Sequence, residues 1–169
     1  MTALRHDDDF YETPDYIFKD LEFRTGLKFG LDICANFQNK KCENYITDDK
    51  YGGILNNEIP ENQPNFYDCP SFCNPPRSKN GKVVNKLYDE WKNYNIDIVM
   101  MLCWNDLGNN YGKKLVPHIK NGDFDIVENY GKIAFWKEGK PVYHTDEKTG
   151  KLVEWPSRLT YFSLWFKKQ

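Results

Sequence analysis

Asn74, Pro75 and Pro76 are the residues whose types and spacing most clearly suggest chemistry. The side-chain oxygen of an asparagine can accept one hydrogen of a primary amine, and a main-chain carbonyl beside the prolines, which lack local N–H donors, can accept the other. Holding both hydrogens turns the lone pair of a planar amine toward an electrophile, and positioning then supplies most of the catalysis. The same three residues could instead be a strand end with a proline turn, and the residues alone leave both interpretations open.

Asp32 is a second candidate because it follows Leu31 in a short apolar segment that ends in small residues. A carboxylate at the end of a strand can meet a cationic amino group, organise the loop that holds one, or act as the N-cap of a following helix. These roles do not exclude one another.

Three helices are predicted to position these groups. The first has Thr13 as its N-cap, Pro14 at its first helical position and Gly26 as its end. Its apolar residues recur at the spacing of one helical face: Ile17, Phe18 and Leu21. A second helix follows the prolines, with Val83, Leu87 and Trp91 on its apolar face, and a third is predicted within 109–120.

Strands are predicted where short apolar segments end in loops or prolines. The ranges are 29–35, 45–47, 72–73, 96–103, 125–127, 132–136 and 158–166. The segment 96–103 is near-continuously apolar, which is typical of a central strand. This order predicts a three-layer α/β fold, with a mostly parallel sheet and an antiparallel C-terminal edge. Ligands bind at the carboxyl ends of such strands, where Asp32 and Asn74 are predicted to lie.

Composition narrows the class of protein. The 169 residues suit one domain over 1–169, with residues 1–12 loose, and the 23 Lys and Arg against 25 Asp and Glu leave any nucleic-acid contact to local patches. The 5 cysteines are odd in number and form no CxxC pair, which argues against a zinc site or a complete disulfide framework, and no metal site is expected. No apolar segment is long enough to cross a bilayer, so we expect a cytoplasmic protein of a prokaryotic or virus-infected cell, with no membrane association and no obligate protein partner.

The order of these motifs resembles the phage-type DNA adenine N6-methyltransferase (Dam) family. The matching pieces are Glu12-Thr13-Pro14, then Gly30-Leu-Asp-Ile-Cys-Ala35, then Asn39-Lys-Lys-Cys-Glu-Asn-Tyr45 with Asp48 and Asp49 behind it, then Phe72-Cys-Asn-Pro-Pro76. The resemblance covers about 12–166. It implies a Rossmann-like methyltransferase fold, S-adenosylmethionine as cofactor, DNA as partner, and methyl transfer to the exocyclic amino group of an extruded adenine.

The resemblance also assigns roles to residues of this chain. Thr13, Pro14 and Phe18 would border the cofactor. Its methionine end would be held by Asp32 and Ala35, and its ribose or adenine by Asp48 or Asp49. The target base would be held by Asn74, Pro75 and Pro76.

Arg77 departs from the family pattern, which normally has an aromatic residue that stacks on the base. A guanidinium plane can also stack on a base, and Trp104, after the central strand, could supply a ring beside it. Arg77 itself and the lysines that follow it, Lys79, Lys82 and Lys86, could contact flanking phosphates or simply face solvent. Sequence recognition is expected in the loops 49–70 and 137–157.

Other functions stay open at this point. An Asn-Pro-Pro site handles any planar amine, so the acceptor could be a cytosine, an RNA base or a protein amide, and the chain could also be a non-catalytic DNA-binding module. A metal-dependent nuclease would use aspartates such as Asp7, Asp8, Asp9, Asp48 and Asp49, but the first of these lie in the segment predicted to be loose.

Overall fold

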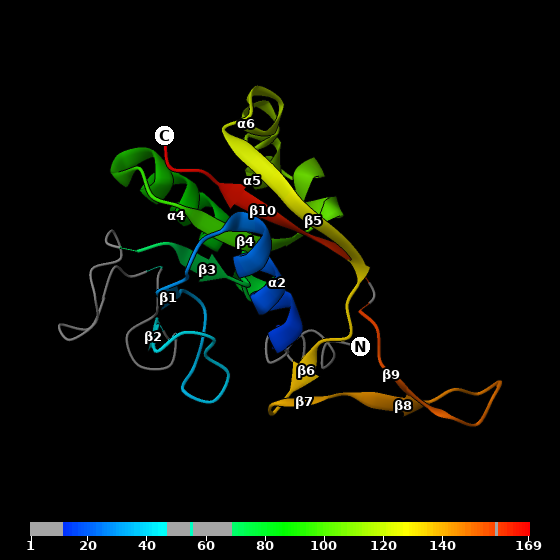
Figure 1. Cartoon of the computed structure of the whole chain (residues 1–169). Coiled ribbons are helices and arrows are strands. Elements are labelled where there is room, and N and C mark those ends of the chain that lie inside the picture. The colour runs from blue at the N-terminus through cyan, green and yellow to red at the C-terminus, as the bar shows by residue number, and fades with distance from the viewer. Residues whose placement is uncertain (1–11, 47–54, 56–68, 158) are drawn as a thin grey trace.

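The computed structural model describes residues 12–46, 55, 69–157 and 159–169 (Figure 1). Among these residues, no helix is both long and apolar enough to span a membrane. Glu12, expected to be loose, is instead 8% exposed and pairs with Trp136 through main-chain hydrogen bonds of 2.7 and 2.9 Å. The expectation for residues 1–11 lies outside the described residues.

The central feature is a six-stranded sheet in the order β2-β1-β3-β4-β10-β5. Its strands are β1 (Leu31–Asp32), β2 (Asn44–Tyr45), β3 (Ser71–Cys73), β4 (Ile98–Cys103), β5 (Phe124–Lys132) and β10 (Thr160–Phe166). The four strands β2, β1, β3 and β4 are parallel, whereas β10 runs antiparallel to both β4 and β5. The sheet is therefore mostly parallel, as predicted, although β1 is much shorter than the predicted segment 29–35.

The predicted antiparallel C-terminal edge is present, because β10 and β5 pair antiparallel at that end of the sheet. β10 lies inside the sheet, between β4 and β5, and β5 forms the edge. The physical reason is burial: Phe162, Leu164 and Phe166 of β10 are fully buried, whereas β5 is largely exposed after Phe124. A strand with both faces apolar is most stable between two others.

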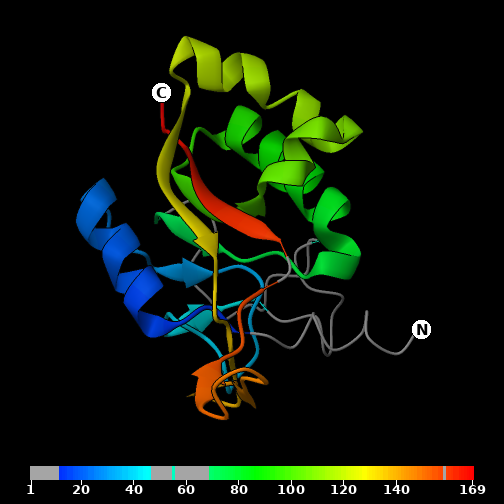
Figure 2. The same cartoon turned by 90° about the vertical axis from the view of Figure 1, so that its right-hand side faces the viewer.

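Helices cover both faces of the sheet. Figure 2 shows α2 (Asp15–Thr25) on one side and α4 (Asn80–Tyr94), α5 (Asn110–Lys113) and α6 (Val116–Asn121) on the other. β4 alternates between the two resulting cores, with Ile98, Met100 and Leu102 packed on the α4 side and Val99, Met101 and Cys103 on the α2 side. The predicted helix within 109–120 is thus two short helices, α5 and α6.

The start of α2 differs from the prediction. Pro14, not Thr13, is the N-cap residue, and no side chain caps the helix. The predicted end is correct, because Gly26 adopts the left-handed conformation with φ 71°, where a Cβ would be strained. The Thr13 side chain is therefore available for another contact.

The segment between β5 and β10 forms two hairpins that project from the body (Figure 1). β6 (Trp136–Lys137) pairs with β7 (Lys140–Pro141), and β8 (Tyr143–Thr145) pairs with β9 (Leu152–Glu154). The predicted separate strand at 132–136 is wrong, because β5 extends to Lys132 and the chain then leaves the sheet. The reason is that β10 pairs with β5 as far as Lys132, which continues one long strand where two short ones were expected.

Candidate active site

The carboxyl ends of β1, β3 and β4 meet at one edge of the sheet because these strands are parallel and adjacent. Asp32 ends β1, Asn74 follows β3, and Cys103 ends β4. This edge is where open α/β sheets bind ligands. The structure therefore brings together the two strand ends singled out from the sequence and adds a third.

Asn74 is held by the residue that precedes helix α2. Its side-chain Nδ2 donates a hydrogen bond of 3.0 Å to Oγ1 of Thr13, a residue 61 positions away in the chain. An amide whose NH2 group is engaged in this way has its orientation fixed, and its Oδ1 is left as an acceptor. Asn74 is only partly buried, so the residue remains accessible at the strand end.

Asp32 is a buried carboxyl group, 3% exposed, that accepts a hydrogen bond of 2.9 Å from the main-chain N–H of Lys41. Burial raises its pKa from 3.8 to about 6, against the opposing effects of the Lys41 hydrogen bond and charge. The N-cap interpretation is wrong, since no helix begins there and Asp32 organises the loop between β1 and β2. A buried carboxylate with a raised pKa is a typical feature of a site that receives a cation.

Two residues expected to border a cofactor differ in where they lie. Phe18 packs its ring against Phe29 and Phe72, at centroid distances of 5.5 and 5.3 Å, in the core between α2 and the sheet. Ala35 is 8% exposed and follows β1, and its N–H donates to Ile46 at 3.1 Å. Ala35 is thus at the carboxyl ends of β1 and β2, and contact of either residue with a cofactor stays a prediction.

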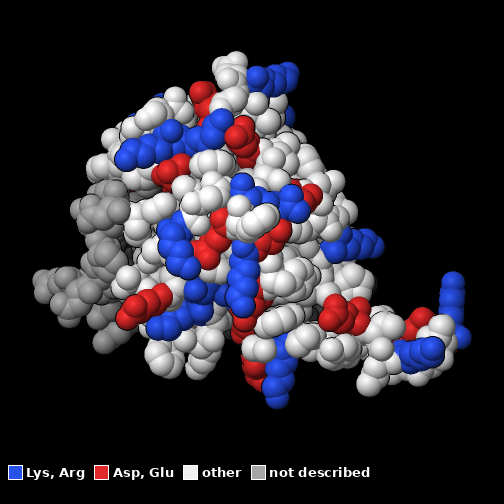
Figure 3. Space-filling view, in the orientation of Figure 1, with Lys and Arg blue, Asp and Glu red and all other residues white. Residues whose placement is uncertain are grey.

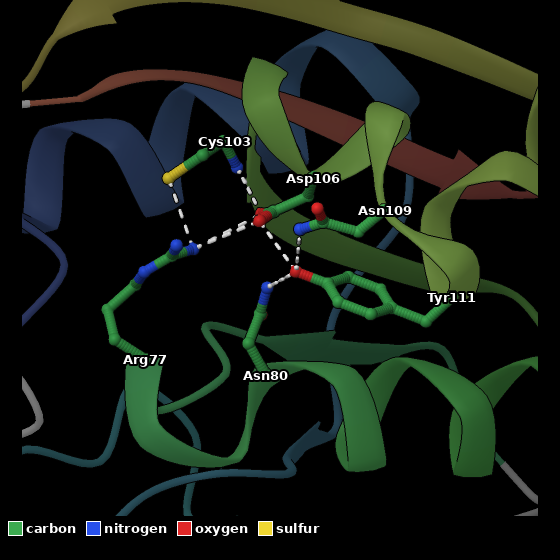
Figure 4. Close-up of polar contacts among 6 residues, drawn as sticks. All are labelled: Arg77, Asn80, Cys103, Asp106, Asn109 and Tyr111. Atoms are coloured by element: carbon green, nitrogen blue, oxygen red, sulfur yellow. Dashed lines mark hydrogen bonds and ion pairs between the residues drawn. The ribbon is translucent and has the colours of Figure 1, made fainter.

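Arg77, directly after the prolines, belongs to a polar network at the end of β4 (Figure 4). Its Nη1 lies 3.2 Å from Oδ2 of Asp106 and 3.2 Å from Sγ of Cys103. Burial has the largest single effect on the pKa of Arg77 and would lower it, but the charge and hydrogen bond of Asp106, together with Cys103 and Tyr161, outweigh burial and the pKa is raised. The guanidinium is therefore charged and held in place, within the 3₁₀ turn η3 (Arg77–Lys79).

Neutral groups complete this wall of the site. Burial raises the pKa of both the Cys103 thiol and the Tyr161 hydroxyl, which are hydrogen-bonded to each other. Phe135 contacts the Tyr161 ring edge-on at 4.9 Å. Cys103 is thus a protonated thiol rather than a nucleophile. Among the described residues, no cluster of histidine, cysteine and carboxylate side chains could hold a metal ion.

Comparison with known proteins assigns the family. The sequence model of the DNA N-6-adenine-methyltransferases (Dam) matches residues 2–135, which is most of the chain. The chain belongs to the DNA N-6-adenine-methyltransferase (Dam) family. No curated protein and no solved structure matches it. The Dam match ends at residue 135, before β6 to β10.

Membership of the Dam family points to DNA adenine N6-methylation as the activity, and methyltransferases generally use S-adenosylmethionine. The activity and its DNA substrate are therefore supported at the level of the family.

Trp104 packs against the protein's own side chains. It stacks on Phe162 at a centroid distance of 4.2 Å, and its Nε1 donates to Asn129 at 3.1 Å. Phe162 belongs to the core on the α4 side, whereas Cys103, the preceding residue, belongs to the core on the α2 side. The placement of Trp104 beside a target base stays a prediction. A base in contact with this ring would have to approach from the α4 side.

The predicted phosphate contacts all lie on η3 and α4. Lys79 at the end of η3 and Lys82 in the first turn of α4 are exposed, close in sequence to Asn74. Lys86 pairs with Glu90 at 2.7 Å. The predicted cofactor contacts Asp48 and Asp49 lie outside the described residues.

Sequence reasoning missed Asp106, Tyr111 and Tyr161 as members of the site. Tyr111 donates to Oδ1 of Asp106 at 2.7 Å, across the turn η4 (Trp104–Gly108). One signal was present, since Asp106 closely follows the strongest predicted strand, at the edge where open α/β sheets bind ligands. Tyr161 had no signal, because its position depends on where β10 inserts.

Proposed function

We propose that this chain is a DNA adenine methyltransferase with a Rossmann-like three-layer fold, which transfers the methyl group of S-adenosylmethionine to the exocyclic amino group of an extruded adenine. The observation that supports it most strongly is the hydrogen bond of 3.0 Å from Asn74 to Thr13, at the carboxyl end of β3. It joins the two motifs expected at the site and fixes an amide acceptor there, in a chain of the Dam family.

Asn74 and the adjacent main-chain carbonyl hold the target nitrogen in this mechanism. Oδ1 of Asn74 accepts one amine hydrogen, and the carbonyl next to Pro75 accepts the other. The nitrogen lone pair is then turned out of the plane of the base, toward the incoming methyl group. Thr13 fixes the rotation of the Asn74 amide, so this arrangement is already present before the base enters.

S-adenosylmethionine, when bound, supplies a methyl group on a positively charged sulfur that is a good leaving group. The described residues fit such a ligand, because Asp32 is a buried carboxylate whose raised pKa shows that its charge is poorly compensated. Asp32 and Ala35 would hold the methionine end, and Thr13, Pro14 and Phe18 would border it. Asp48 or Asp49 would hold the ribose or the adenine.

DNA binding must rely on local contacts. Basic and acidic side chains are mixed on the face drawn in Figure 3, in keeping with the net charge of −2. An adenine amine inside a duplex is unreachable, so the base must be extruded and the backbone held around the gap. In this proposal the exposed side chains of Lys79 and Lys82 contact flanking phosphates, and the loops 49–70 and 137–157 are the candidate recognition elements.

The direct test is transfer of labelled methyl groups from S-adenosylmethionine to DNA, followed by nucleoside analysis. We expect N6-methyladenine from the wild type and no product from Asn74→Ala. Thr13→Val should lower kcat by about tenfold, the usual size of a lost positioning contact, because the Asn74 amide loses its acceptor.

Thr25→Val is a matched control, since Thr25 donates to Leu21 at the far end of α2. This control should methylate DNA at the wild-type rate. Label in N4-methylcytosine, in RNA or in protein would change the acceptor, and no transfer with intact DNA binding would make the chain a binding module.

A further inference from the structure

Asp106 is the centre of the polar network at the end of β4 (Figure 4). It is 1% exposed, and its carboxylate accepts hydrogen bonds from the Cys103 main-chain N–H at 2.8 Å and from the Tyr111 hydroxyl at 2.7 Å. Tyr111 in turn accepts hydrogen bonds from Asn80 at 3.0 Å and from Asn109 at 3.1 Å. The carboxylate is therefore held by β4 and α5, and the Tyr111 hydroxyl that holds it is itself fixed by Asn80 of α4 and by Asn109 before α5.

This carboxylate determines where the Arg77 guanidinium lies. Nη1 of Arg77 contacts both carboxylate oxygens of Asp106, at 3.2 and 3.4 Å. Within the described part of the chain, Nη1 makes all the hydrogen bonds of this guanidinium. Its side chain stays 30% exposed. One edge of the plane is thus fixed to the protein, while the Arg77 side chain, which directly follows Asn74-Pro75-Pro76 in the chain, stays partly open to solvent.

The ion pair also decides which ligand Arg77 suits. A cation already paired with a carboxylate attracts a phosphate weakly, because the two charges largely cancel at a distance. Its flat face remains available, and a guanidinium plane stacks well on the face of a nucleobase. The arrangement favours a neutral, planar ligand over a backbone phosphate.

We propose that Asp106 is a positioning residue that holds the Arg77 guanidinium flat against the ring of the target base while Asn74 holds its amino group. This inference rests on the proposed function and adds to it the group that recognises the base ring. Asp106 acts only through Arg77.

The test compares Asp106→Asn, Arg77→Lys, Arg77→Phe and the double variant Arg77→Phe/Asp106→Asn. Base stacking of this kind usually changes affinity or rate by about tenfold. We expect Asp106→Asn and Arg77→Lys each to lower kcat/KM for DNA by about tenfold, with an unchanged KM for S-adenosylmethionine. Phenylalanine supplies a plane that needs no anchor, so Arg77→Phe should stay within about threefold of wild type, and the double variant should match it.

A second readout separates positioning from folding. Once the methylated site is mapped, 2-aminopurine can replace the target adenine in the DNA. Binding of wild type or Arg77→Phe should then change the fluorescence of 2-aminopurine, whereas binding of Asp106→Asn should not. The order of melting temperatures should differ from the order of activities. Arg77→Phe should be the least stable variant, because it leaves the Asp106 carboxylate buried without its cation. The double variant Arg77→Phe/Asp106→Asn should recover stability, because it also removes that charge. Asp125→Asn, which breaks an exposed ion pair with Lys167 at 3.1 Å, is the matched control and should behave as wild type in both assays.

Each outcome decides for or against the role of Asp106. Wild-type kinetics in Asp106→Asn would overturn the proposal, because removing the carboxylate would then have no effect. A double variant as impaired as Asp106→Asn alone would also overturn it, because the effect of Asp106 would then be independent of residue 77. If Asp106→Asn does not fold, the comparison of Arg77→Lys with Arg77→Phe decides, and wild-type activity in Arg77→Lys would refute it. A wild type that methylates no DNA would instead overturn the proposed function together with this inference.

Discussion

Replacing Asp32 by asparagine should remove a specific pH dependence from the stability of this protein. Asp32 has its pKa raised from 3.8 to about 6 in the folded chain by burial. The difference of roughly 2 pKa units corresponds to about 3 kcal/mol, at about 1.4 kcal/mol per unit. Because the folded state favours the protonated carboxyl, this stability is fully present below pH 3.8 and is lost as the pH rises to about 6.

The assay is urea unfolding of wild type and Asp32→Asn between pH 4.5 and 7.5. Asparagine keeps an oxygen that can accept the Lys41 N–H, so the two proteins differ mainly in the titrating charge. Over this range the wild type should lose about 2 kcal/mol of unfolding free energy relative to the variant, because part of the effect is already lost at pH 4.5. A difference that does not change with pH would refute the assignment of a buried, poorly compensated carboxyl.

The same group should couple proton release to cofactor binding. A cationic amino group next to Asp32 stabilises its ionised form, so the bound state has a lower pKa than the free protein. By calorimetry, the affinity for S-adenosylhomocysteine, which has the same amino group, should rise with pH up to about 6 and then level off. Equal pH profiles for wild type and Asp32→Asn would place the methionine end of the cofactor elsewhere.

Three further predictions concern the residues around the site. Replacing Lys79 and Lys82 together by alanine should weaken DNA binding and reduce its salt slope by about 2, and a slope equal to that of wild type in a salt titration would argue against phosphate contacts. Trp104→Ala should slow methylation if the ring lies beside the extruded base, and unaltered steady-state kinetics would disprove that placement. Gly112→Ala should cost about 3 kcal/mol or more, because its Cβ would overlap the main-chain oxygen of Asp106; a melting temperature equal to that of wild type would show that this close approach is not real.

Local sequence patterns determined the elements that depend on near neighbours in the chain. The apolar segment that became β4 predicted a central strand, because a strand buried on both faces needs no polar alternation. The prolines after Asn74 predicted the end of β3, since a residue without an N–H cannot continue a ladder. Gly26 ended its helix for a similarly local reason, its tolerance of positive φ.

Only the tertiary structure decided which of these elements meet. β10 inserts between β4 and β5 because its two apolar faces are buried best there, and no pattern within β10 specifies its neighbours. The partner of Asn74 proved to be Thr13, which sequence patterns assigned to a helix cap. Arg77 meets Asp106 only because β3 and β4 are adjacent and parallel, so that their carboxyl ends lie side by side. Side-chain types and local periodicity thus defined the candidate groups, whereas strand order and register determined their geometry, because these depend on contacts between residues far apart in the chain.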